Sequence, residues 1–145
     1  MKRVLKLICI VLSLSMLLAI PAHAAETGNA RASSYFSNSA VYLYKLSSKT
    51  FEAWFEVTCV RTMDKVGAKE IKIQRSTDNE TWSNVATYSM DDYSHLILDN
   101  EIGHEACVTY TGSSGYYYRA QYKLYAKDET GTGVWTRTSA TIYIE

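Results

Sequence analysis

The chain has 145 residues, and its 15 Lys and Arg are balanced by 15 Asp and Glu. A chain of this length fits one domain, and a neutral charge without any basic block argues against nucleic acid as a partner. Twelve tyrosines are a high count, so not all of them can lie in a core.

The N-terminus has the order of a secretory signal peptide. Basic Lys2, Arg3 and Lys6 precede an apolar run at 7–20, and Pro-Ala-His-Ala follows with a small-residue cleavage site. The sequence therefore predicts a cleaved signal over residues 1–24, with an uncleaved anchor as the alternative. The apolar run is short for a membrane span. We expect an exported protein, secreted or at the cell surface, with no membrane span after cleavage and a net charge of −3 from 12 basic and 15 acidic residues.

Residues 25–39 are polar and predict a flexible lead-in. Beyond them, short runs of β-type pattern alternate with turn signals. Strands are expected at residues 40–46, 51–61, 70–75, 82–89, 105–111, 116–127 and 136–144.

The clearest of these patterns is YYYRAQYKLYAKD at 116–128. Its strict alternation of apolar and polar residues predicts a central strand with one buried face. No segment after the signal has a sustained helical period. The sequence thus predicts an all-β domain over residues 40–145, a Greek-key β-sandwich of about seven strands, with a small closed barrel as the rival.

Two stretches carry a resemblance to known modules. IKIQRSTDNETWSNVATY (71–88) and GYYYRAQYKLYAKD (115–128) resemble bacterial fibronectin type III or immunoglobulin-like domains. With TMDKVGA (62–68) included, the pattern is similar to a family of small secreted Gram-positive proteins of unknown function. The resemblance implies that a corner tyrosine, Tyr116 or Tyr118, bonds back to the main chain. It implies no catalytic residue.

Two cysteines remain after the signal, Cys59 and Cys107. In an exported chain such a pair most often forms a disulfide. We expect that bridge, with two separate thiols as the alternative.

The sequence offers little for catalysis or metal binding. His95 and His104 both fall in or beside an irregular stretch, and no Gly-x-Ser-x-Gly turn is present. Acidic groups around Asp78 and Asp99 have no established ligand spacing. We expect no enzyme activity, no cofactor and no metal.

The remaining feature is a set of aromatic and polar residues in outward phase. Flat rings beside amides and charges suit sugar rings or a protein partner, although tyrosine also stabilises sheets by itself. The candidate binding residues are Tyr117, Arg119, Gln121, Lys123, Tyr125, Tyr143 and Trp54. The sequence thus predicts a non-catalytic binding or structural module whose ligand is a polysaccharide or an extracellular protein. The alternatives are an accessory or inhibitory subunit of a larger assembly and, less favoured, a hydrolase.

Overall fold

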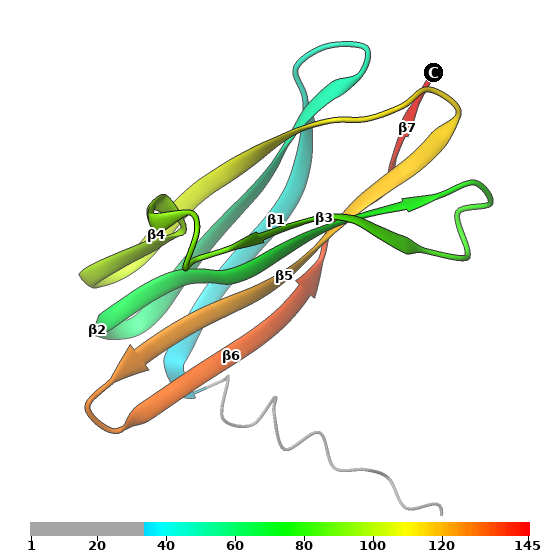
Figure 1. Ribbon diagram of the computed structural model, residues 1–145. Helices are drawn as coiled ribbons and strands as arrows, with labels where there is room; N and C mark the ends of the chain where they lie inside the picture. Colours follow the sequence, from blue (N-terminus) through cyan, green and yellow to red (C-terminus); the bar gives the residue numbers. More distant parts are fainter. Residues whose placement is uncertain (1–33) are drawn as a thin grey trace, which may run out of the picture.

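The structure is a computed structural model that describes residues 34–145. The expected signal peptide and most of the lead-in lie outside the described residues. The described chain is all-β (Figure 1). Its elements are β1 (Phe36–Lys45), β2 (Thr50–Ser76), β3 (Ser83–Ser89), the 3₁₀ turn η2 (Ser94–Leu96), β4 (Ile97–Thr111), β5 (Tyr116–Asp128), β6 (Gly131–Thr138) and β7 (Ile142–Ile144).

All seven strands belong to one antiparallel sheet built around β2. One edge of β2 pairs first with β1 and then with β5, while the other edge pairs with β4 and then with β3. The strands β6 and β7 pair with the far edge of β5. The prediction of about seven antiparallel strands is therefore confirmed. The strands are hydrogen-bonded into one sheet because β2 runs through both halves of the molecule.

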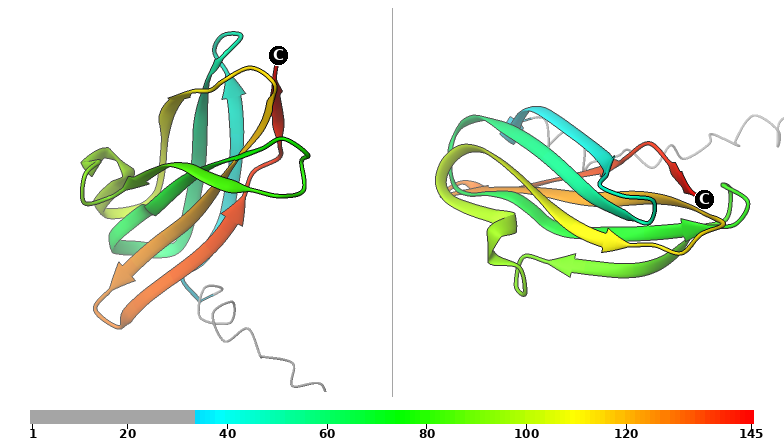
Figure 2. Two further views of the ribbon diagram at one scale, coloured as in Figure 1. Left: turned by 45° about the vertical axis from the view of Figure 1, so that its right-hand side comes forward. Right: turned by 90° about the horizontal axis from the view of Figure 1, so that it is seen from above.

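A wide irregularity in β2 bends this sheet. Thr58 pairs with Gly103 and Met63 pairs with Glu101, so the four residues 59–62 lie opposite Ile102 alone. Extra residues on one strand bend that strand and increase its twist. The sheet consequently curls into a half-barrel, and the two halves of β2 lie on opposite sides of the core (Figure 2).

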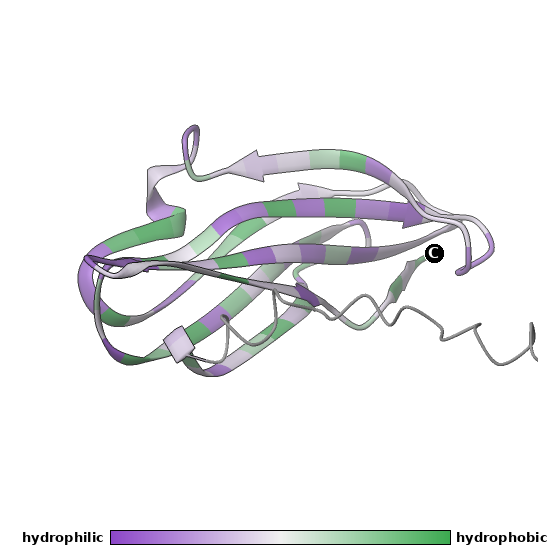
Figure 3. Ribbon diagram, turned by 90° about the horizontal axis from the view of Figure 1, so that it is seen from below, coloured by the Kyte–Doolittle hydropathy of each residue, from purple (hydrophilic) through white to green (hydrophobic). Residues whose placement is uncertain are grey.

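Alternation along the strands fills the core. The buried positions of the first half of β2 and of β5 are Phe51, Ala53, Phe55, Val57, Cys59, Tyr118, Ala120, Tyr122, Leu124 and Ala126. Hydrophobic and hydrophilic residues accordingly alternate along the ribbons (Figure 3). The rings of Phe51 and Tyr118 touch across the core, with their centroids 5.4 Å apart. The inward phases expected for these two strands are confirmed.

The strand boundaries differ from the predictions in four places. The expected strands 51–61 and 70–75 are one 27-residue strand, because the segment around Gly67 continues the sheet. That glycine has a φ of 150°, and a Cβ there would lie 2.0 Å from the carbonyl oxygen of Leu96. The expected strand 136–144 is divided into β6 and β7, and β4 begins at Ile97. The lead-in ends earlier than residue 39, because β1 starts at Phe36.

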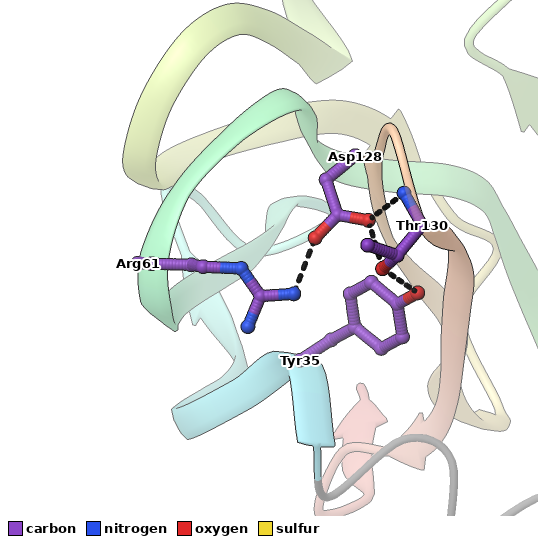
Figure 4. A network of polar contacts seen from close by, with 4 residues as sticks. All are labelled: Tyr35, Arg61, Asp128 and Thr130. Carbon is purple, nitrogen blue, oxygen red and sulfur yellow. Dashed lines mark hydrogen bonds and ion pairs between the residues drawn. The ribbon is translucent and has the colours of Figure 1, made fainter.

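Two polar contacts hold the ends of β5. At its start, the Ser113 N–H donates to the hydroxyl of Tyr118 at 2.8 Å, which confirms the expected corner tyrosine. At its end, the carboxylate of Asp128 accepts hydrogen bonds from the main chain and hydroxyl of Thr130 and forms an ion pair with Arg61 (Figure 4). The Thr130 hydroxyl also bonds the hydroxyl of Tyr35 at 3.3 Å. The hydroxyl of Thr130 and then Arg61 lower the pKa of Asp128 to about 2.

Candidate functional site

Six of the seven candidate residues lie on one outer face of the sheet, which we call the β5 face. This face consists of the outward residues of β5 with their neighbours on β2, β3, β4, β6 and β7 and the residue Trp82 before β3. Its members are Tyr117, Arg119, Gln121, Lys123, Tyr125, Lys127, Lys65, Glu70, Lys72, Gln74, Trp82, Asn84, Thr87, Ser89, Asp99, Thr132, Val134, Thr136, Thr138 and Tyr143. The alternation along β5 predicts that its outward residues lie together, and the pairing of β5 with β7 brings Tyr143 beside Tyr117.

An aromatic cluster with one cation occupies one end of the β5 face. The rings of Tyr117 and Tyr143 pack with centroids 4.8 Å apart. The guanidinium of Arg119 lies over the ring of Trp82, 4.2 Å from its centroid. Its Nε donates to the side-chain oxygen of Gln74 at 2.8 Å. Stacking on the ring and the hydrogen bond to Gln74 together fix the orientation of the Arg119 guanidinium.

Trp82 was missed by the sequence reasoning as a site residue. It precedes β3, which pairs with the last part of β2 as a hairpin. The signal that could have found it is this hairpin register, which carries the residue before β3 toward Gln74 and hence toward Arg119. An Arg and a Trp 37 positions apart in the sequence give no local pattern.

The middle of the β5 face is organised around one carboxylate. Glu70 lies 2.9 Å from the ammonium of Lys123 and 3.2 Å from that of Lys72. The hydrogen bond from Lys123 is the main cause that lowers the pKa of Glu70 below its usual range. Beyond them Lys127 is exposed, and its neighbour Lys65 is paired with Asp99 at 2.8 Å. The face therefore has five cations and two carboxylates.

Trp54, the seventh candidate, lies on a different surface. It belongs to the outward side of β1, the first half of β2 and the second half of β4, which we call the β1 face. The members of this face are Ala40, Tyr42, Tyr44, Glu52, Trp54, Glu56, Thr58, Glu105, Cys107 and Thr109. The Trp54 ring stacks on Tyr42 at a centroid distance of 6.3 Å, and its N–H donates to Glu52. The assignment of Trp54 to the candidate face was wrong because the bend in β2 turns its first half to the opposite side.

The expected disulfide is not present, and both cysteines are free thiols. Cys59 is buried in the inward phase of β2. Cys107 pairs with Trp54, whose side chain points outward. The two cysteines therefore project from opposite faces of the sheet, and no rotamer change could join them. Burial, partly offset by Arg61, raises the pKa of the Cys59 thiol to about 11.

The two histidines bond main-chain groups near the free edge of β4. The Nε2 of His95 lies 3.1 Å from the carbonyl oxygen of Cys107, and the Nε2 of His104 lies 2.7 Å from that of His95. Within residues 34–145, no three His, Cys, Asp or Glu side chains are grouped to hold a metal ion. Asp78 instead closes its own turn by accepting from the main chain of Glu80 and Thr81.

The structure gives an all-β scaffold with an outer face on which the Tyr117–Tyr143 ring pair, Arg119 and Glu70 are held by neighbouring side chains. Among residues 34–145, no helix has the length and apolar composition needed to cross a lipid bilayer.

Comparisons with known proteins add little to this description. No protein-family profile matches the chain, and no curated protein matches it. Among solved structures, the sporulation control protein Spo0M from Bacillus subtilis is similar over 70% of this chain, with a TM-score of 0.41 and 8% sequence identity. The match covers 47% of the Spo0M chain.

Proposed function

We propose that the chain is an exported, non-catalytic binding module of the fibronectin III or immunoglobulin-like class, and that it holds a polysaccharide on the β5 face. The observation that carries this proposal is the fixed array of rings and polar groups along β5. Tyr117 is packed by Tyr143, and Arg119 is held by Trp82 and Gln74. Side chains already ordered in the free protein lose less conformational entropy when they bind a ligand.

The chemistry of the array suits sugar rings. Tyrosine and tryptophan present flat apolar surface at a low entropy cost, and amides beside them can hydrogen-bond hydroxyl groups. Gln121 supplies an amide in the middle of the β5 face. The face is a sheet surface, which suits a polymer better than an enclosed small molecule.

The proposed class and location rest on further support. The corner contact of Tyr118 with Ser113 is of the kind that fibronectin III and immunoglobulin-like sandwiches use. The predicted signal over residues 1–24 supports export to the medium or cell surface.

The test is retention of the purified chain in gels containing different polysaccharides. Tyr117→Ala/Tyr125→Ala should lower the affinity for the retained polysaccharide by about tenfold or more. The matched control is Tyr42→Ala/Tyr44→Ala, which removes two exposed rings from the β1 face and should leave retention unchanged. Equal loss in both variants would show that the β5 face is not the site. No retention of the wild type would favour the alternative, an accessory subunit with a protein partner.

A further inference from the structure

We propose that the ligand of the β5 face is an anionic polysaccharide, a sugar polymer that carries acid groups along its length. This inference rests on the proposed function and specifies its ligand. The first observation is the segregation of charge. Residues 34–145 contain 11 Lys and Arg and 14 Asp and Glu, a net charge of −3. The β5 face has five cations and two carboxylates, a net charge of +3, so the rest of the described chain has −6.

The second observation is the linear spacing of the cations. Arg119, Lys123 and Lys127 occupy every fourth position of β5 and point to the same face. At about 3.3 Å per residue, successive cations are roughly 13 Å apart. Tyr117 and Tyr125 lie in the same row. A row of separated charges with rings beside it fits an extended polymer with repeated acid groups better than one compact anion.

The third observation is that the acids beside this row are already paired. The residues of β6 that pair with the row on the same face are Thr132, Val134, Thr136 and Thr138, and none of them carries a charge. On the other side, Glu70 is shared by Lys72 and Lys123, and Asp99 is paired with Lys65. Two cations on one carboxylate leave one positive charge uncompensated, so this central group still attracts an anion.

Two other anionic occupants are less favoured. A nucleic acid is less favoured because nucleic-acid-binding domains are usually strongly basic, whereas residues 34–145 have a net charge of −3. A second copy of the chain could offer its β1 face, where Glu52, Glu56 and Glu105 lie. That face covers three strands and about five rows, or roughly 500 Å² per partner, which is small for a stable interface.

The experiment compares two polymers with the same sugar backbone, one with free carboxylates and one with neutral methyl esters. Binding of the purified chain to polygalacturonate and to its methyl ester is measured by titration calorimetry. We expect the polyuronate to bind at least about tenfold more tightly, and its affinity to fall as NaCl rises from about 50 to 500 mM. Equal binding of both polymers overturns the anionic ligand but leaves the proposed function in place. If neither they nor a wider polysaccharide panel binds, both proposals fail.

Charge variants locate the effect on the β5 face. Lys123→Gln/Lys127→Gln should lower affinity for polygalacturonate by about tenfold. The control Lys49→Gln removes a cation in the turn between β1 and β2, outside the face, and should change it by less than about twofold. Thr138→Lys, which adds a cation beside Gln121, should raise affinity by about threefold. An unchanged affinity in both β5-face variants overturns the inference.

The purified chain also serves to test the two alternative ligands of the β5 face, a nucleic acid and a second copy of the chain. Binding of polydeoxythymidylate as tightly as polygalacturonate would overturn the choice of a sugar polymer. Light scattering at low salt gives the mass of the free chain, and we expect that of a monomer. A dimer that dissociates at high salt and in Glu56→Gln/Glu105→Gln would overturn the inference, because the β5 face would then be occupied by a second copy.

Discussion

The β1 face and the β5 face share the strand β2 but differ in how their charged side chains are paired. On the β5 face, the second half of β2 places Glu70 between Lys72 and Lys123, and all three are ion-paired. On the β1 face, the first half of β2 places Glu56 directly opposite Glu105 of β4. Opposite charges across strands stabilise a sheet and like charges destabilise it. The charged residues at the centre of the β5 face therefore stabilise the sheet, whereas the facing carboxylates of the β1 face do not.

The faces also differ in how their rings are held. Trp54 stacks on Tyr42 and donates its N–H to Glu52, so its polar edge is already occupied. Trp82 is covered instead by the guanidinium of Arg119. Tyr42 and Tyr44 are 46% and 56% exposed, so the β1 face has exposed rings without cations among its outward residues. The two faces therefore provide matched sites where the same substitution should have different consequences.

The largest expected effect tests whether the faces share one core. Phe51 lies behind the β1 face and packs on Tyr118 behind the β5 face. Phe51→Ala should lower the free energy of unfolding by about 3–5 kcal/mol, because it leaves a cavity in the core that the two halves of the sheet enclose. Urea unfolding followed by far-UV and near-UV circular dichroism should show one transition at a lower midpoint. Two separate transitions would show that the two halves of the sheet unfold independently, so that the β1 face and the β5 face would belong to two separate folding units.

The next prediction concerns the acid range, where the end of β5 depends on a carboxylate. The pKa of Asp128 is about 2 in the folded chain and about 3.9 in an unfolded one, so its ionised form stabilises the fold. This contribution is complete above about pH 5 and is lost as the pH falls toward 2. Asp128→Asn should therefore lower the urea midpoint at pH 6 and have little effect near pH 2.

The β1 face supplies the control for that pH dependence. Glu56→Gln removes a carboxylate that faces Glu105 rather than a cation, so, unlike Asp128→Asn, it should not lower the urea midpoint at pH 6. A constant difference between wild type and Asp128→Asn from pH 6 to pH 2 would contradict the role assigned to the Asp128 carboxylate.

A smaller effect distinguishes the two thiols. Cys107 is partly exposed on the β1 face, while Cys59 is 2% exposed in the core. Burial raises the pKa of both thiols, that of Cys59 to about 11, and only thiolates react rapidly. Within residues 34–145, a chromogenic disulfide reagent at pH 8 should modify one of the two thiols in the native chain and both of them in urea. No reaction in urea without a reductant would show a disulfide, contrary to the structure.

Local alternation made much of this fold predictable. The strands at 51–61 and 116–127 have strict inward and outward phases, so their buried residues could be assigned from the sequence alone. The resemblance to fibronectin type III or immunoglobulin-like modules implied a corner contact by Tyr116 or Tyr118, and Tyr118 makes it with a residue five positions away. The outward row on β5 followed from the same phase.

Long-range geometry was not predictable in this way. The bend at 59–62 is defined by its pairing with Ile102, about forty residues later, and this bend moved Trp54 to the other face. The same pairing placed Cys107 opposite Trp54, out of phase with Cys59, and so excluded the disulfide. The contact of Arg119 with Trp82 likewise depends on two strand registers at once.

The smallest expected effect compares the two carboxylate positions directly. Glu105→Gln removes one of two like charges that face each other across β2 and β4, so it should raise the free energy of unfolding by about 0.5 kcal/mol. Glu70→Gln leaves Lys72 and Lys123 facing each other without their shared partner, so it should lower that free energy by about 0.5–1 kcal/mol. Urea midpoints of the two variants should therefore move in opposite directions, and both shifts should shrink in about 1 M NaCl because salt screens surface charges. If Glu105→Gln destabilised the chain as much as Glu70→Gln, Glu105 would have a stabilising partner and the β1 face would be electrostatically ordered like the β5 face.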